Sequence, residues 1–147
     1  MLLDVDDHIE VAGAAAAKAR FSATGAAASS QSIRYNATPQ YNSQQQLVSC
    51  SGSFGNQGCN GGWYFYAWDY MQTNAQVSAA TYPYTSGKLG LTKACTYVAG
   101  SGIMYDLSQT DTATDTASIV AAITLQPQAV AIEADQPVFQ NYVSGVI

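Results

Sequence analysis

The stretch CSGSFGNQGCNGG, residues 50–62, decides which folds this sequence can form. It contains two of the three cysteines of the chain, nine positions apart and surrounded by glycine. So short and glycine-rich a segment cannot form a regular helix or a central strand, because glycine loses much conformational freedom on ordering. Three cysteines cannot all pair with one another, so one of Cys50, Cys59 and Cys95 is left over. A loop of this kind needs something to hold its shape.

The composition fits one globular domain and excludes two classes of partner. The chain has 147 residues, 48% of them hydrophobic, which suits a single packed core. Its 5 basic and 10 acidic residues give a net charge of −5 and a pI near 4.3. Such a chain offers neither a basic surface for nucleic acid nor a polybasic segment for an anionic membrane. No apolar run approaches membrane-spanning length, so we expect no nucleic acid and no membrane as partner.

The N-terminal sequence MLLDVDDHIE carries acids where a signal peptide has positive charge and then a long apolar run. We therefore expect no signal peptide in this chain, and the export signal of a secreted protein would lie outside these residues. His8, the one histidine, lies in this acidic segment, where we expect a solvated side chain rather than a metal ligand or catalytic base. The sequence has no phosphate-binding loop and no paired Cys-x-x-Cys, so it predicts neither a cofactor nor a metal site.

Residues 12–32 are rich in alanine and interrupted by glycine only at Gly13 and Gly25, which favours a helix. Phe21, Gly25 and Ala28 fall on one face of that helix, and we expect this narrow face to be buried. The alternative is a low-complexity segment that frays in water.

Two more helices are expected in the middle of the chain. Asn42 or Ser43 can cap a short helix that ends before Cys50. A second helix follows the glycine-rich stretch, and we assign its apolar stripe to the core. The residues of that stripe are Tyr64, Ala67, Trp68 and Met71.

The last third of the sequence combines helix and strand. Asp115 can cap a helix that Pro127 stops. The side chains expected to face inward on this helix are Ile119, Ala122 and Ile123. Residues 129–134 alternate as in a half-buried strand. Helices first and then a mixture of strand and helix indicate an α+β fold.

Five segments, in order and at matching spacing, resemble the papain-like cysteine peptidases. They are FSATGAAASSQS, NSQQQLVSC, SGSFGNQGCNGGW, TYPY and VAIEADQPVFQNYVSGVI. The Gly-Cys-Asn-Gly-Gly element, Gly58–Gly62, is distinctive for that family. The resemblance covers Phe21–Ile147, which is most of this chain but only the first part of a complete family domain.

The resemblance implies a papain-like fold with a helical lobe and an incomplete β-lobe. Residues 1–20 would be a divergent N-terminal segment, 21–105 the helical lobe and 106–147 the partial β-lobe. The incomplete β-lobe would leave an exposed apolar patch and an open sheet edge. The residues of that patch are Val130, Ile132 and the region 139–142. The family also implies a secreted, lysosomal or vacuolar location.

In the family, the glycine-rich loop lies along the active-site cleft and pairs through its backbone with an extended peptide or protein substrate. By position, Gly61 and Gly62 would supply these backbone groups, because a peptide can approach closely where no Cβ intervenes. Trp63, Tyr64 and Ala131 would line the pocket for the substrate side chain that dominates specificity. The alternative is a disulfide-pinned surface turn that binds nothing.

The catalytic residues of the family have no counterpart in this sequence. Aligned on Phe21, the nucleophile position holds Lys18 and the position of the oxyanion-stabilising glutamine holds Ala12. His8 precedes the nucleophile position and cannot replace the histidine of the family. The sequence therefore predicts no catalytic residue of its own.

The resemblance also assigns the cysteines. The family cysteine that normally pairs with the one at Cys59 falls on Ala15, so Cys59 is expected to be a free thiol. By the second bridge of the family, we expect a disulfide between Cys50 and Cys95.

Three interpretations of the function remain open. In the first, the chain is a papain-family cysteine peptidase in partial form, inactive as written. In the second, it is a non-catalytic relative that binds peptides or proteins through the surviving cleft wall. The third interpretation is a non-functional remnant that folds poorly.

Overall fold

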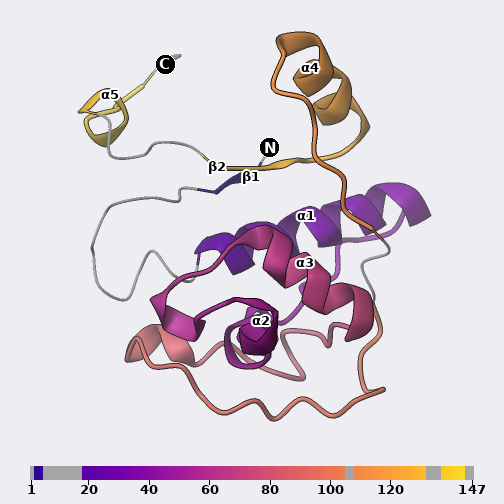
Figure 1. Ribbon diagram of the computed structural model, residues 1–147. Helices are drawn as coiled ribbons and strands as arrows, with labels where there is room; N and C mark the ends of the chain where they lie inside the picture. The colour runs from indigo at the N-terminus through magenta and orange to yellow at the C-terminus, as the bar shows by residue number, and fades with distance from the viewer. Residues whose placement is uncertain (1, 5–17, 105–107, 132–136, 145–147) are drawn as a thin grey trace.

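The computed structural model describes residues 2–4, 18–104, 108–131 and 137–144 (Figure 1). Its strands and α-helices are, in order, β1 Leu2–Asp4, α1 Lys18–Tyr35, α2 Gln44–Cys50, α3 Tyr64–Thr73, α4 Thr116–Leu125, β2 Ala129–Ala131 and α5 Pro137–Gln140. Short 3-10 turns cover Ser51–Phe54, Gly58–Asn60 and Ser86–Lys88.

The core forms where α1 packs against α2 and α3 (Figure 1). Its fully buried side chains include Ala23 of α1, Leu47 of α2, and Ala67 and Met71 of α3. The predicted apolar stripe of α3 is therefore confirmed as core. The indole of Trp68 adds a polar link between the helices, because its Nε1 donates to the Ala23 carbonyl (3.3 Å).

The predicted inward face of α1 is wrong. Phe21 is 40% exposed, and its ring packs edge-on against Tyr84 with centroids 5.1 Å apart. The buried face carries Ala23 and Ala26 instead. Small side chains let α3 approach α1 closely, whereas a phenylalanine in the same place would hold the two helices apart.

Both predicted helix caps are present. Ser43, one of the two candidates, accepts from the Gln46 N–H at Oγ (3.0 Å), and α2 extends through Cys50. Asp115 accepts from the Ser118 N–H at Oδ1 (3.0 Å) and so caps α4. These bonds satisfy N–H groups that the first helical turn leaves without a partner.

The predicted burial of one face of α4 is wrong. The helix projects from the rest of the molecule (Figure 1), and none of its residues is buried. Ile119 and Ile123 are each 41% exposed, and Ala122 is only partly covered. An apolar face is buried only where another element packs on it, and no described element covers α4 in this way.

A two-stranded parallel sheet lies across α1 from α2 and α3 (Figure 1). Val130 of β2 is paired with Leu3 of β1, a strand that the sequence pattern did not predict. This pairing leaves Val130 half-buried, as the alternating pattern predicts for this strand, so its predicted place in an exposed apolar patch is wrong. Tyr142 is exposed as predicted, while Ile132 and the rest of the predicted strand lie outside the described residues.

Candidate functional site

The glycine loop, Gly55–Gly62, is held by side-chain hydrogen bonds rather than by regular structure. Buried Asn56 donates from Nδ2 to Ser51 Oγ (2.9 Å) and accepts from the Trp63 N–H at Oδ1 (3.0 Å). One amide therefore joins the residue after α2 to the residue before α3. This bond pair keeps the intervening loop in one shape.

Gly61 and Gly62 are the last two residues of the glycine loop. Their φ values of 122° and 151° lie in a region that favours glycine over residues with a Cβ. A Cβ added at Gly61 would meet no heavy atom within 4 Å, so the space beside it is open. The Gly61 carbonyl accepts from the Gln57 N–H (2.9 Å), whereas the Gly62 N–H and C=O have no hydrogen-bond partner in the described part of the chain. The Gly62 N–H and C=O therefore keep their hydrogen-bonding capacity.

Trp63 and Tyr64 differ in what their rings contact. The Trp63 ring is 37% exposed and stacks on Phe65 with centroids 5.6 Å apart. The Tyr64 ring packs edge-on against Trp68 at 5.1 Å and contacts the hydrophobic core. Trp63 can therefore offer an aromatic surface to a ligand beside Gly62, while Tyr64 stabilises the start of α3.

The other predicted site positions lie on α1 and β2. Lys18, at the aligned nucleophile position, is the first residue of α1, and Ala131 is the last residue of β2. In Figure 1 the N-terminal end of α1 lies between β2 and the part of the chain that contains α2. Ala12, Ala15 and His8 lie outside the described residues.

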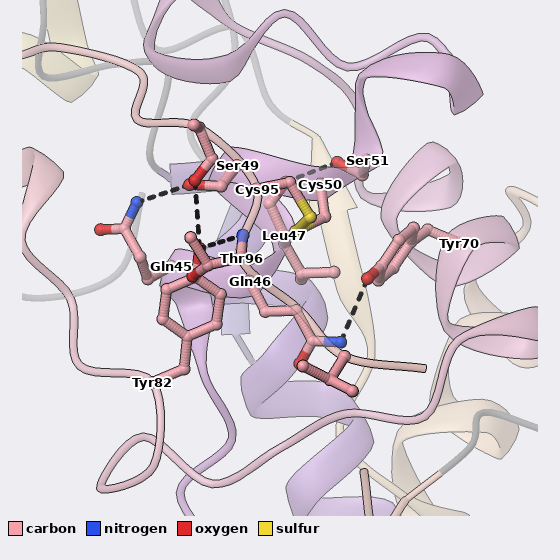
Figure 2. The surroundings of a disulfide bond; sticks show 12 residues. Gln45, Gln46, Leu47, Ser49, Cys50, Ser51, Tyr70, Tyr82, Cys95 and Thr96 are labelled. Atoms are coloured by element: carbon pink, nitrogen blue, oxygen red, sulfur yellow. Dashed lines mark hydrogen bonds between the residues drawn. A yellow bond between two sulfur atoms is a disulfide. The ribbon is translucent and has the colours of Figure 1, made fainter. Parts of the chain in front are cut away.

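The structure contains the disulfide that the resemblance implies. Cys50 and Cys95 are bonded, with Cα atoms 4.9 Å apart (Figure 2). The bridge joins the last residue of α2 to an exposed segment, and the chain-entropy model gives such a loop about 4 kcal/mol of stabilisation. Cys59 is free and buried, and its N–H donates to Thr92 Oγ1 (2.7 Å).

A fully buried glutamine behind the glycine loop was not predicted from the sequence. Gln46 Oε1 accepts from the Val77 N–H (2.9 Å), and Nε2 donates to the Ala75 carbonyl (3.0 Å) and the Tyr70 hydroxyl (3.1 Å). Burial raises the pKa of Tyr70, against the opposite effect of the Gln46 hydrogen bond. The sequence signal for its burial was its position in a short capped helix, directly before the two apolar residues Leu47 and Val48.

A concave region lies away from the glycine loop. It is an open cavity of about 730 Å³ between α1, α3 and the segment that follows α4, with Arg34, Tyr35 and Trp68 among its walls.

No cluster of His, Cys, Asp and Glu among the described residues could hold a metal ion. Within the same residues, no helix is long and apolar enough to cross a membrane.

The sequence is similar to cysteine proteases from several organisms. Cysteine proteinase 6 of Dictyostelium discoideum is 38% identical over 130 residues, which cover 86% of this chain and 29% of that protein. Procathepsin L of Mus musculus is 37% identical over 106 residues, which cover 71% of this chain and 30% of that protein. The chain therefore spans less than a third of the length of either relative.

Two solved structures share the fold. The bromelain protease from Ananas comosus, in complex with the E64 inhibitor, has a TM-score of 0.71 at 24% identity and covers 99% of this chain and 63% of its own. The cysteine protease CMS1MS2 of Carica candamarcensis, in complex with E-64, has a TM-score of 0.71 at 21% identity, with 99% of this chain and 65% of that one covered. The predicted α+β fold, a partial papain-like fold, is confirmed.

A sequence model described as papain family cysteine protease matches residues 12–147. The match begins nine residues before Phe21, where the resemblance in the sequence motifs begins. It includes Lys18, the glycine loop and the disulfide. The chain belongs to the papain family of cysteine proteases.

Proposed function

We propose that this chain carries the peptide-binding wall of a papain-like cleft and that these 147 residues alone do not hydrolyse peptide bonds. One observation carries the proposal: among the described residues, the N–H and C=O of Gly62 are unpaired beside the exposed Trp63 ring. The ligand would be an extended peptide or a protein segment. This agrees with the names of the relatives, which are cysteine proteinases and procathepsins.

Binding would use the backbone of the loop. An extended peptide would add to Gly62 as a short strand, with one donor and one acceptor from each chain. Gly61 has no Cβ that would keep the peptide away, and Trp63 supplies apolar surface next to it. Tyr64 and Ala131 remain the proposed lining of the pocket for the specificity-determining side chain.

Hydrolysis would need groups that the aligned positions do not hold. Cysteine peptidases attack with a thiolate whose pKa is lowered by a helix N-terminus and a histidine. Lys18 holds the nucleophile position, and an ammonium there opposes the helix dipole at a cost of roughly 0.3–1 kcal/mol. Ala12 has no amide for the oxyanion. The same observations support the alternative function, a non-catalytic peptide-binding relative.

The location that we propose is an oxidising one, either secreted or in a lysosome or vacuole. A structural disulfide persists in such compartments and is rare in the reducing cytosol. The Cys50–Cys95 bridge is the observation that supports this proposal.

A backbone-methylation scan tests the binding mode on the purified chain. Each labelled peptide would carry one N-methyl group, which removes one donor, and binding would be measured by fluorescence polarisation. Because the Gly62 carbonyl can accept from one N–H of the peptide, affinity should fall roughly 3- to 10-fold at one methylated position and change little at the others.

Two variants complete this experiment. Trp63→Ala should weaken binding, whereas Tyr41→Ala, at an aromatic side chain that is 81% exposed, should leave it unchanged. Undetectable binding, or an equal loss at every methylated position, would contradict the proposal.

A further inference from the structure

Chain statistics do not favour the observed disulfide. Cys50 and Cys95 are 45 positions apart, whereas Cys59 is nine positions from Cys50 and 36 from Cys95. Loop-closure entropy rises with the logarithm of loop length, so an unfolded chain should close the Cys50–Cys59 loop about tenfold more readily than the Cys50–Cys95 loop. The observed bridge has the longest loop of the three, so contacts in the folded chain must select it.

The hydroxyl of Tyr82 lies beside Cys95 (Figure 2). Its oxygen accepts from the Thr96 N–H (3.2 Å), and the hydroxyl donates to the Ala94 carbonyl at the longer distance of 3.4 Å. These two bonds hold the residues on either side of Cys95. The backbone that carries the Cys95 sulfur is therefore fixed by one phenol.

The same hydroxyl contacts the residue before Cys50. Ser49 bonds to the Tyr82 oxygen (Figure 2). Burial would raise the pKa of Tyr82, but the hydrogen bonds from Thr96 and Ser49 outweigh it and lower the pKa. The phenol thus uses both of its acceptor sites and its donor, and it joins the neighbours of the two paired cysteines.

Ser49 and Tyr82 are themselves held in place from α2. Ser49 Oγ accepts from Gln45 Nε2 (2.9 Å), and Gln45 Oε1 accepts from the N–H groups of Thr85 (2.7 Å) and Ser86 (2.9 Å). Gln45 is fully buried. The segment that follows Tyr82 is therefore docked on α2 independently of the disulfide.

Cys59 competes with Cys50 as a possible disulfide partner of Cys95. Its N–H donates to Thr92 Oγ1 (2.7 Å), only three residues before Cys95. A Cβ added at Gly58 would clash with the Thr92 side chain, which shows how closely the two segments pack. The Cys95 segment therefore touches the surroundings of both possible partners.

We propose that Tyr82 is the positioning residue that selects the Cys50–Cys95 bridge over the two pairings with Cys59. With glutathione disulfide as oxidant, one cysteine thiolate forms a mixed disulfide and releases one glutathione thiolate. The second cysteine then attacks the protein sulfur of that mixed disulfide and releases the second. Two electrons pass from the two cysteine thiols to the oxidant in every pairing, so only geometry distinguishes the products.

The test is reoxidation of the reduced full chain in a glutathione buffer, followed by acid quenching and mapping of non-reduced peptides. Wild type should yield the Cys50–Cys95 bridge. In Tyr82→Phe, the ratio of this bridge to the two pairings with Cys59 should fall by about tenfold, because the phenol bonds are lost. Ser49→Ala should lower the ratio in the same direction. The exposed-ring control, Tyr41→Phe, should keep the wild-type ratio.

The same reoxidation in concentrated urea separates positioning from any effect on the unfolded chain. There, wild type and Tyr82→Phe should give one common distribution in which the short Cys50–Cys59 loop dominates. An unchanged native ratio in both Tyr82→Phe and Ser49→Ala would overturn the proposal. So would a difference between wild type and Tyr82→Phe that persists in urea.

Discussion

At the scale of single residues, Asp115 shows how one charge stabilises the start of a helix. Its Oδ1 accepts from the Ser118 N–H (3.0 Å), and the hydrogen bonds from Ser118 hold the pKa of the carboxyl below its ordinary value of 3.8. A carboxyl with a lower pKa in the folded chain contributes stability above its unfolded pKa. That contribution is lost as pH falls through the folded pKa.

We therefore expect the cap of α4 to open in acid. Protection of the Ser118 amide, measured by hydrogen exchange and corrected for the intrinsic rate, should decrease as pH falls below 3.8. Asp115→Asn keeps an acceptor but does not titrate, so its protection should not depend on pH in this range. A wild-type amide that stays fully protected down to about pH 2 would contradict the assignment.

The two helix caps could be predicted because each bond joins residues three positions apart and depends on nothing distant. Ser43 and Asp115 are polar residues that directly precede a run of helix-forming residues. The bonds of Gln46 and Tyr82 could not be predicted in this way. Gln46 bonds to residues 24 to 31 positions later, and such pairings exist only once the chain has folded.

At the scale of elements, α2 is held to the rest of the helical region by its buried amides. Gln46 Oε1 accepts a hydrogen bond from the Val77 N–H. Gln46 Nε2 donates to the Ala75 carbonyl and to the Tyr70 hydroxyl. The Gln46 amide thus pairs with backbone groups that a neighbouring strand would satisfy in a sheet. It satisfies backbone groups that water cannot reach.

Replacing this amide should be costly. Gln46→Leu leaves buried polar groups unsatisfied, and we expect the free energy of unfolding to fall by about 1–3 kcal/mol in urea titrations. Gln44→Leu, on the same helix but only partly buried, is the matched control and should change stability by less than about 0.5 kcal/mol. Equal effects of the two substitutions would show that the Gln46 bonds do not matter.

Burial of whole elements was harder to predict than their existence. The alanine-rich α1 could bury either the Phe21 face or the Ala23 face, because its apolar pattern does not distinguish them. The pairing of β1 with β2 joins residues at opposite ends of the chain, and no local signal announces it. The glycine loop was predictable in its position, since its motif is distinctive, but Asn56 as its anchor was not.

At the scale of the whole molecule, α4 exposes an apolar surface. Its large side chains Ile119, Val120, Ile123 and Leu125 are all exposed. Val138 and Val143 are also exposed near the C-terminal end of the described chain. Exposed large apolar side chains that gather on one helix, as on α4, drive self-association or recruit another protein.

We expect the purified chain to self-associate with increasing concentration through α4. The double substitution Val120→Glu and Ile123→Lys should reduce association, since two charges interrupt the apolar surface and, three positions apart, can pair with each other without destabilising the helix. Sedimentation velocity over a range of concentrations measures the effect. Leu89→Lys, an exposed leucine outside α4, is the control. A wild-type chain that is monomeric at every concentration, with a sharp cooperative melt, would contradict this expectation.

The central proposal concerns the whole cleft: we propose that the chain keeps a wall for binding peptides and lacks, at the aligned positions, the groups that would cleave them. Thiolate, histidine and oxyanion donors act as a unit in cysteine peptidases, and the loss of one oxyanion donor alone costs about 10²–10³ in rate. Here Lys18 and Ala12 occupy two of these positions, and the single histidine is His8. Lys18→Cys should therefore restore no activity, because no aligned histidine would activate the new thiol.

The most direct measurement is the cleavage of a fluorogenic dipeptide substrate by the purified chain, with and without a thiol-alkylating inhibitor. We predict no turnover above the buffer rate in either condition, for wild type and for Lys18→Cys. Turnover by the wild-type chain that the inhibitor abolishes would contradict the claim, since it would show that a cysteine of this chain acts as a nucleophile.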